Sequence, residues 1–184
     1  MSELEGLAVR IPPDMIQHWG WFLALGIGLL LLGIAAVVRS VKATVISMLF
    51  FGWMLVLAGG IEVVQALLVG KWAGAFLHVV AAVLFLVTGV LILRKPVIGA
   101  EIVTIFMAMF FLIGGLFQLV ASLALREPDW GWQALNGIVT SLLGVLVLAQ
   151  WPASGLWVIG LFVGIDLIFR GWAWVALALD LRRM

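Results

Sequence analysis

Two ionisable side chains stand inside an apolar run near the end of the sequence. Asp166 and Arg170 interrupt a stretch that is otherwise apolar from Leu156 to Leu179. An unpaired aspartate or arginine at the centre of a membrane helix costs about 2.5–3.5 kcal/mol to insert. A spacing of four residues places both side chains on one helical face, within reach of each other. We therefore predict an intrahelical ion pair turned toward the protein interior, which fixes packing, serves an ion or proton path, or regulates assembly.

Four further polar side chains fall inside apolar segments at a similar depth. Glu62, His78, Gln118 and Asn136 each lie about 9–10 Å from a helix end, at 1.5 Å per residue. If they face one another, they form a polar layer in the half of the membrane nearer the termini. Glu62 is the strongest candidate for a functional change of protonation, since intramembrane acids are often functional and a histidine is close in depth. The alternative is interhelical hydrogen bonding, worth about 0.6 kcal/mol for each bond.

Other kinds of chemistry have no support in the sequence. The chain has two histidines and no cysteine, so we expect no metal site, no haem and no thiol catalysis. It also lacks a P-loop, a dinucleotide-binding glycine pattern and a zinc-protease motif. We therefore expect no cofactor and no enzymatic activity. A net charge of +1 gives no reason to expect a nucleic-acid partner.

The composition identifies the class of protein. Hydrophobic residues make up 66% of the chain and charged residues 10%, against about 45–50% and about 25% in soluble domains. The apolar runs are continuous, whereas the strands of membrane barrels alternate polar and apolar residues. The predicted fold class is therefore an all-α integral membrane protein in contact with the lipid bilayer.

Six segments are long enough to cross a bilayer, which takes about 20 mostly apolar residues. Short polar breaks separate them, and brief connections produce antiparallel helical hairpins. We expect residues 1–18 to form a short cytosolic tail before an uncleaved first span. The predicted spans are 19–38, 44–69, 73–93, 97–125, 130–149 and 153–181 within a single transmembrane domain, 19–181.

The sequence also repeats itself. WGWFLALGIGLLLLG at 19–33 aligns with WGWQALNGIVTSLLG at 130–144, and Gly89 marks a looser middle copy. The period is about 55 residues, which gives three tandem hairpins of two spans each. Because each copy has an even number of spans, the repeats are parallel and related by a pseudo-threefold axis along the membrane normal.

Small residues recur at matching places in the second helix of each copy. Such residues allow helix backbones to approach closely, so we predict packing within the chain, with a dimer face as the alternative. An even number of spans places both termini on one side of the membrane. The basic residues of the connections favour neither side clearly, and we expect cytoplasmic termini. The predicted packing residues are Gly59, Gly60, Gly114, Gly115, Gly160 and Gly164.

Three stretches together carry a family resemblance. They are WGWQALNGIVTSLLGVLVLAQWP at 130–152, GLWVIGLFVGIDLIFRGWAWVALAL at 155–179 and LRKPVIGAEIVTIFMAMFFLIGG at 93–115. In this pattern the chain resembles the HdeD family of bacterial acid-resistance membrane proteins. The resemblance implies a multi-pass protein of the bacterial inner membrane that contributes to survival of acid stress. The first turn, RSVKAT at 39–44, departs from the pattern because it lacks the proline of the other two.

Two functions of different classes fit these expectations. The first is a non-enzymatic membrane scaffold that assembles with itself or with a membrane-protein partner and supports acid or envelope stress resistance. The second is a transporter or channel that handles protons or small solutes through the intramembrane polar layer. Because the polar groups are few, we favour the scaffold.

Overall fold

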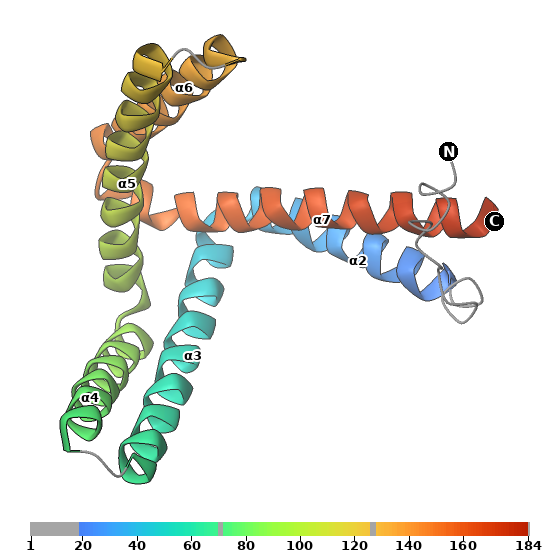
Figure 1. Ribbon diagram of the computed structural model, residues 1–184. Coiled ribbons are helices and arrows are strands. Elements are labelled where there is room, and N and C mark those ends of the chain that lie inside the picture. The colour runs from blue at the N-terminus through green and yellow to red at the C-terminus, as the bar shows by residue number, and fades with distance from the viewer. Residues whose placement is uncertain (1–18, 70–71, 126–127, 184) are drawn as a thin grey trace, which may run out of the picture. The chain divides into compact units, whose positions relative to one another are not determined.

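The computed structural model describes residues 19–69, 72–125 and 128–183. In these ranges the chain is all-helical, with six long helices and one short 3₁₀ turn (Figure 1). The predicted N-terminal tail, 1–18, lies outside the described residues. The elements are α2 (Trp19–Val38), α3 (Ser40–Leu68), α4 (Trp72–Arg94), α5 (Pro96–Leu125), α6 (Trp130–Ala149), the 3₁₀ turn η2 (Ala153–Leu156) and α7 (Val158–Arg183).

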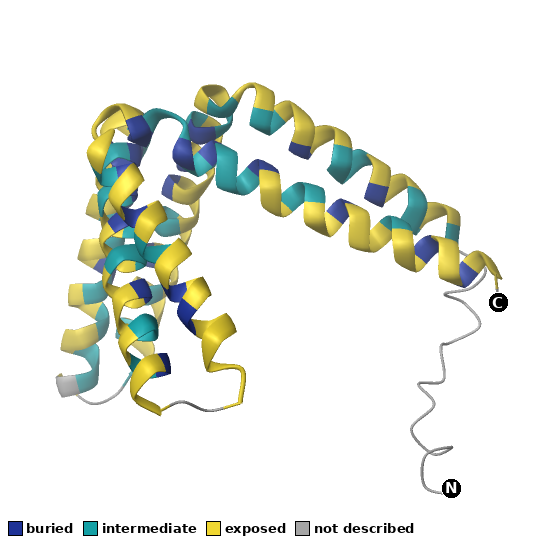
Figure 2. Ribbon diagram, turned by 90° about the horizontal axis from the view of Figure 1, so that it is seen from above, coloured by how far each residue is buried: buried dark blue, intermediate teal, exposed yellow. Residues whose placement is uncertain are grey.

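All six long helices have the length and apolar composition needed to cross a membrane. Large apolar side chains cover their outer faces, so most of the ribbon in Figure 2 is exposed. Exposed apolar side chains suit a bilayer, and helices satisfy their backbone hydrogen bonds internally, as the hydrocarbon core demands. The predicted fold class, an all-α integral membrane protein with six transmembrane helices in tandem repeats, is confirmed.

The boundaries differ from the prediction at two helix starts. Arg39 alone separates α2 from α3, so the second helix begins four residues earlier than expected. The sixth helix begins at Val158 instead of residue 153, because Ala153–Leu156 form a 3₁₀ turn after Pro152. Hydropathy could not predict this turn, since a 3₁₀ turn and an α-helix carry the same apolar residues.

The chain divides into two compact units, each described by itself. Unit 1 comprises residues 1–38 and 163–184, and unit 2 comprises residues 39–162. In unit 1, α2 packs along α7 through glycines on both helices. A Cβ atom added to Gly33 would lie 2.8 Å from the carbonyl oxygen of Gly164, and one added to Gly26 would lie 3.0 Å from that of Gly171. The two backbones are therefore in direct contact.

Unit 2 contains two further helix pairs, α3 with α4 and α5 with α6, each joined by a short connection (Figure 1). The α3/α4 pair meets the start of α5 around Met48, Ile92 and Ala100. A second cluster joins Ala108 of α5, Val147 of α6 and Val158 of α7. The buried core is thus small, as expected for a protein whose outer surface faces lipid.

The helix pairs of the two units repeat the same backbone contact. The contact joins Gly33 to Gly164 in α2/α7, Gly89 to Gly52 in α4/α3 and Gly144 to Ala108 in α6/α5. Residues 52, 108 and 164 are spaced by 56, and residues 33, 89 and 144 by 56 and 55. The second helix of one repeat therefore pairs with the first helix of the next, and α7 of the last repeat pairs with α2 of the first.

The predicted packing glycines divide into two groups. A Cβ atom added to Gly59, Gly115, Gly160 or Gly164 would collide with a neighbouring helix, whereas one added to Gly60 or Gly114 would meet nothing within 4 Å. The packing prediction is therefore wrong for Gly60 and Gly114. The second glycine of each pair repeats in sequence, but it lies 100° around the helix from the first, so only one of the two faces the partner.

Candidate functional site

The α3/α4 pair carries an acid and an imidazole in direct contact. Nδ1 of His78 lies 2.7 Å from Oε2 of Glu62, across the gap between the two helices. Both side chains are partly buried, with 23% of Glu62 and 31% of His78 exposed. The pair can exist as a carboxylate with an imidazolium or as two neutral groups, because one proton can reside on either side chain. It is thus able to bind and release protons.

The α5/α6 pair carries two amides at a matching depth. Nδ2 of Asn136 donates a hydrogen bond to Oε1 of Gln118 at 3.3 Å. Gln133 and Trp132 line the same shallow pocket beside these amides. The two amides satisfy each other without any charge, so this pair provides an interhelical hydrogen bond and no ionisable group.

The repeat places a third pair at the same position in unit 1. Glu62, Gln118 and Trp174 are spaced by 56 residues, and Phe22 precedes His78 by 56. The rings of Phe22 and Trp174 stack with centroids 5.6 Å apart and planes within 1°. One structural position therefore holds an acid–imidazole contact, an amide hydrogen bond and an aromatic stack in the three helix pairs.

Asp166 and Arg170 form the predicted ion pair but do not face the partner helix. Nε of Arg170 donates to Oδ2 of Asp166 at 2.7 Å, and 68% of the arginine and 55% of the aspartate side chain are exposed. Gly164 and Gly171 face α2, and Asp166 lies about 200° around the helix from Gly164 at 100° per residue. The prediction of an inward-turned pair is therefore wrong for the α2/α7 pair.

The predicted polar layer takes the form of separate contacts. The structure joins Glu62 to His78 and Gln118 to Asn136, and no hydrogen bond or ion pair links these two contacts within the ranges it describes. Depth along a helix follows from counting residues, but depth does not determine which neighbour a side chain meets. The layer was therefore inferred from too little information.

Two buried hydroxyl groups that the sequence analysis overlooked hold unit 2 together. Oγ1 of Thr44 accepts a hydrogen bond of 2.9 Å from the backbone N–H of Gly160, in the first turn of α7. Oγ of Ser154 donates to the carbonyl oxygen of Val147 at 2.9 Å. The first N–H groups of a helix have no intrahelical partner, so Thr44 caps α7 from another helix. A buried threonine inside an apolar span was the available signal.

Metal binding finds no cluster of ligands in the part of the chain that the structure describes. No group of three or more histidine, aspartate or glutamate residues is close enough there to hold a metal ion. The Glu62–His78 contact alone offers only two such ligands, whereas protein zinc sites use three or four.

Comparison with known proteins supports the repeat. A family described as "Short repeat of unknown function (DUF308)" matches residues 24–94 and 80–149. The two matches begin 56 residues apart, and each contains one complete helix pair, α3/α4 in the first and α5/α6 in the second. Neither a curated protein nor a solved structure matches the chain.

Proposed function

The chain belongs to the DUF308 family of short repeats, and from this premise we propose that it is a non-enzymatic scaffold of the bacterial inner membrane, with cytoplasmic termini. The family includes HdeD-like membrane proteins, and the three stretches quoted above resemble HdeD. We therefore assign the scaffold to resistance against acid or envelope stress. It would act by assembling with itself or with a membrane-protein partner.

One observation carries the proposal, namely the direct backbone contact that recurs in each helix pair. The contacts Gly33–Gly164, Gly89–Gly52 and Gly144–Ala108 leave no room for a solute between paired helices. The polar side chains of α3/α4 and α5/α6 are satisfied within their own pair. A solute path needs polar groups that follow one another through the membrane, so this arrangement supports a structural role.

The cellular role is tested by complementation. A strain that lacks the gene should lose survival at low external pH, and the wild-type chain should restore it. If the protein is a scaffold, Glu62→Gln should restore survival as well, because the glutamine keeps the interhelical hydrogen bond. Cross-linking in native membranes should capture a dimer or a partner. A strain without any stress phenotype, or a strictly monomeric protein, would contradict the proposal.

The Glu62–His78 contact favours proton handling as a second candidate function, because both groups can bind a proton. Purified protein in vesicles under a pH gradient distinguishes the two functions. The scaffold predicts that wild type, Glu62→Gln and Asp166→Asn all leak protons at the rate of empty vesicles. A wild-type rate several times that of empty vesicles, abolished by Glu62→Gln, would support transport instead.

A further inference from the structure

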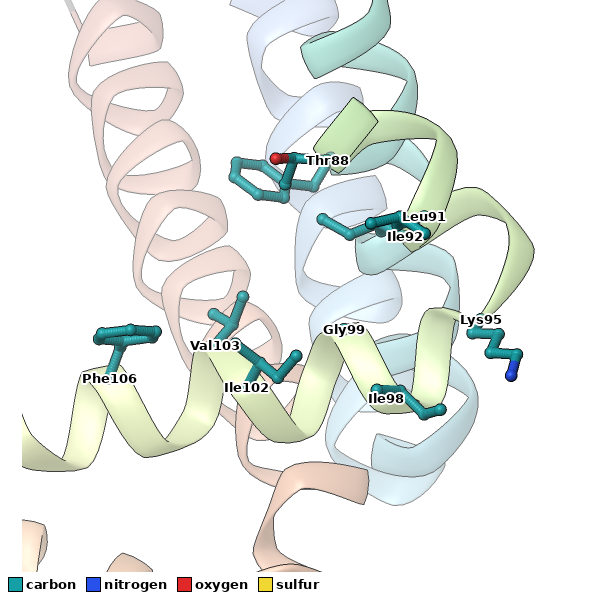
Figure 3. A pocket seen from close by; sticks show the side chains of 10 residues that line it. Thr88, Leu91, Ile92, Lys95, Ile98, Gly99, Ile102, Val103 and Phe106 are labelled. Carbon is teal, nitrogen blue, oxygen red and sulfur yellow. The ribbon is translucent and has the colours of Figure 1, made fainter. Parts of the chain in front are cut away.

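A groove opens between α3, α4 and α5 in unit 2, with a volume of about 380 Å³ (Figure 3). Apart from Thr88 and Lys95, every residue that lines it is apolar or glycine. Its walls include Leu91, Ile98 and Phe106, whose side chains are 61%, 46% and 75% or less exposed, at 68% for Phe106. In a membrane this opening faces the acyl chains of the lipids, and an acyl chain has the shape and polarity to enter it.

Lys95 gives the groove a charged end. It is the single residue between α4 and α5, and a connection between two transmembrane helices lies near the membrane surface. Figure 3 shows its ammonium nitrogen directed away from the apolar side chains of the groove. The lining includes no acidic residue among those described. A lipid whose chain occupies the groove would therefore bring its phosphate to the ammonium group.

A second groove, between α5, α6 and α7, corresponds to the first residue by residue. It is lined by Leu146, Val147, Gln150, Val158 and Phe162, among others, and has a volume of about 170 Å³. These five residues follow five residues of the first groove by 55 or 56 positions, namely Leu91, Ile92, Lys95, Ile102 and Phe106. The second groove is smaller, and a neutral glutamine replaces the lysine. The two grooves therefore differ in the charge at one equivalent position.

We propose that the Lys95 groove is a binding site for an anionic phospholipid. One acyl chain lies against the apolar walls of α3, α4 and α5, and the lipid phosphate pairs with Lys95 at the membrane surface. Basic residues beside grooves between membrane helices recognise anionic headgroups in this way. The Gln150 groove accepts a chain without selecting the headgroup.

Native mass spectrometry of the full-length protein tests the site. The protein is reconstituted into nanodiscs that contain equal amounts of phosphatidylglycerol and phosphatidylcholine with identical acyl chains. We expect the most tightly retained lipid of the wild type to be phosphatidylglycerol, with a preference of about fivefold, as one basic group near the surface provides. Lys95→Gln should abolish the preference, and Gln150→Lys should add a second retained phosphatidylglycerol.

Two controls separate the groove from general surface charge. Lys42→Gln removes a basic residue from α3 that does not line the groove, so it should leave the preference unchanged. Ile102→Trp fills the groove from an exposed position and should reduce retention of both lipids. An unchanged preference in Lys95→Gln, or an equal loss in Lys42→Gln, would overturn the proposal. Retention of both lipids by Ile102→Trp at the wild-type level would overturn the groove as the site of the chain.

Discussion

At the scale of single residues, the fold offers one position in each of its helix pairs and fills it differently each time. The acid–imidazole contact of Glu62 and His78 stands where the next pair has an amide bond from Asn136 to Gln118. Unit 1 has stacked aromatic rings at the corresponding place. A polar contact between membrane helices contributes about 0.6 kcal/mol on average and about 1.7 kcal/mol at most. The Glu62–His78 contact should lie toward the upper end, because hydrogen bonds to charged groups are the stronger ones.

A double-mutant cycle measures this difference. The variants Glu62→Ala, His78→Ala and their combination should give a coupling energy of about 1–1.7 kcal/mol in unfolding by detergent. The matched cycle on Gln118 and Asn136 should give a smaller coupling, near about 0.6 kcal/mol. Equal couplings in the two cycles would show that the charge of the first pair adds nothing to its strength.

At the scale of helices, stability depends on how closely two backbones approach. A Cβ atom on Gly115 would lie 2.5 Å from the backbone nitrogen of Ser141, and one on Gly137 would lie 2.8 Å from the carbonyl oxygen of Gly115. Neither distance can be relieved by turning a flexible side chain, since the atoms that collide belong to the backbone. The α5 and α6 helices would have to separate along the whole contact.

Two adjacent glycines of α5 provide a matched test. Gly115→Ala should lower the free energy of unfolding by about 1–3 kcal/mol, the usual effect of overpacking. Gly114→Ala should leave it unchanged or raise it by up to about 1 kcal/mol, because alanine favours the helix and the position is open. The measurement is equilibrium unfolding in mixed micelles. If both variants were equally destabilised, the contact between α5 and α6 would not be the cause.

At the scale of the whole chain, the first and last membrane helices meet. α2 packs on α7 through Gly26, Gly33, Gly164 and Gly171, which is the same contact that α3 makes with α4 and that α5 makes with α6. The first helix has no preceding repeat along the chain, and the last has no following one. By pairing with each other, the two helices cover the glycine face that each would otherwise expose to lipid.

Cysteine cross-linking tests this pairing, because the natural chain has no cysteine. The double variant Phe22→Cys with Trp174→Cys should cross-link within one chain through a short bis-maleimide, since the two rings are stacked. Leu25→Cys with Trp174→Cys should cross-link much less, because Leu25 is an exposed residue of α2. Products joined only between two chains would instead show that α2 pairs with α7 of a second copy.

Hydropathy and periodicity sufficed to predict the fold class, the six spans and the repeat. Each of these properties is local to a segment or depends on comparing two segments, so it can be read along the sequence. The ion pair of Asp166 with Arg170 was equally predictable, because both residues lie on one helix and their spacing determines their distance. The start of α7 was not, since the 3₁₀ turn before it is as apolar as the helix itself.

The sequence by itself therefore determined that this chain crosses the membrane six times in like-oriented repeats with few polar side chains inside. Only the tertiary structure decided that Glu62 meets His78, that Gly115 packs while Gly114 does not, and that Asp166 and Arg170 lie away from α2. The physical reason is rotation about the helix axis. Each residue advances the direction of its side chain by 100°, and which direction faces a neighbour depends on where the other helices pack.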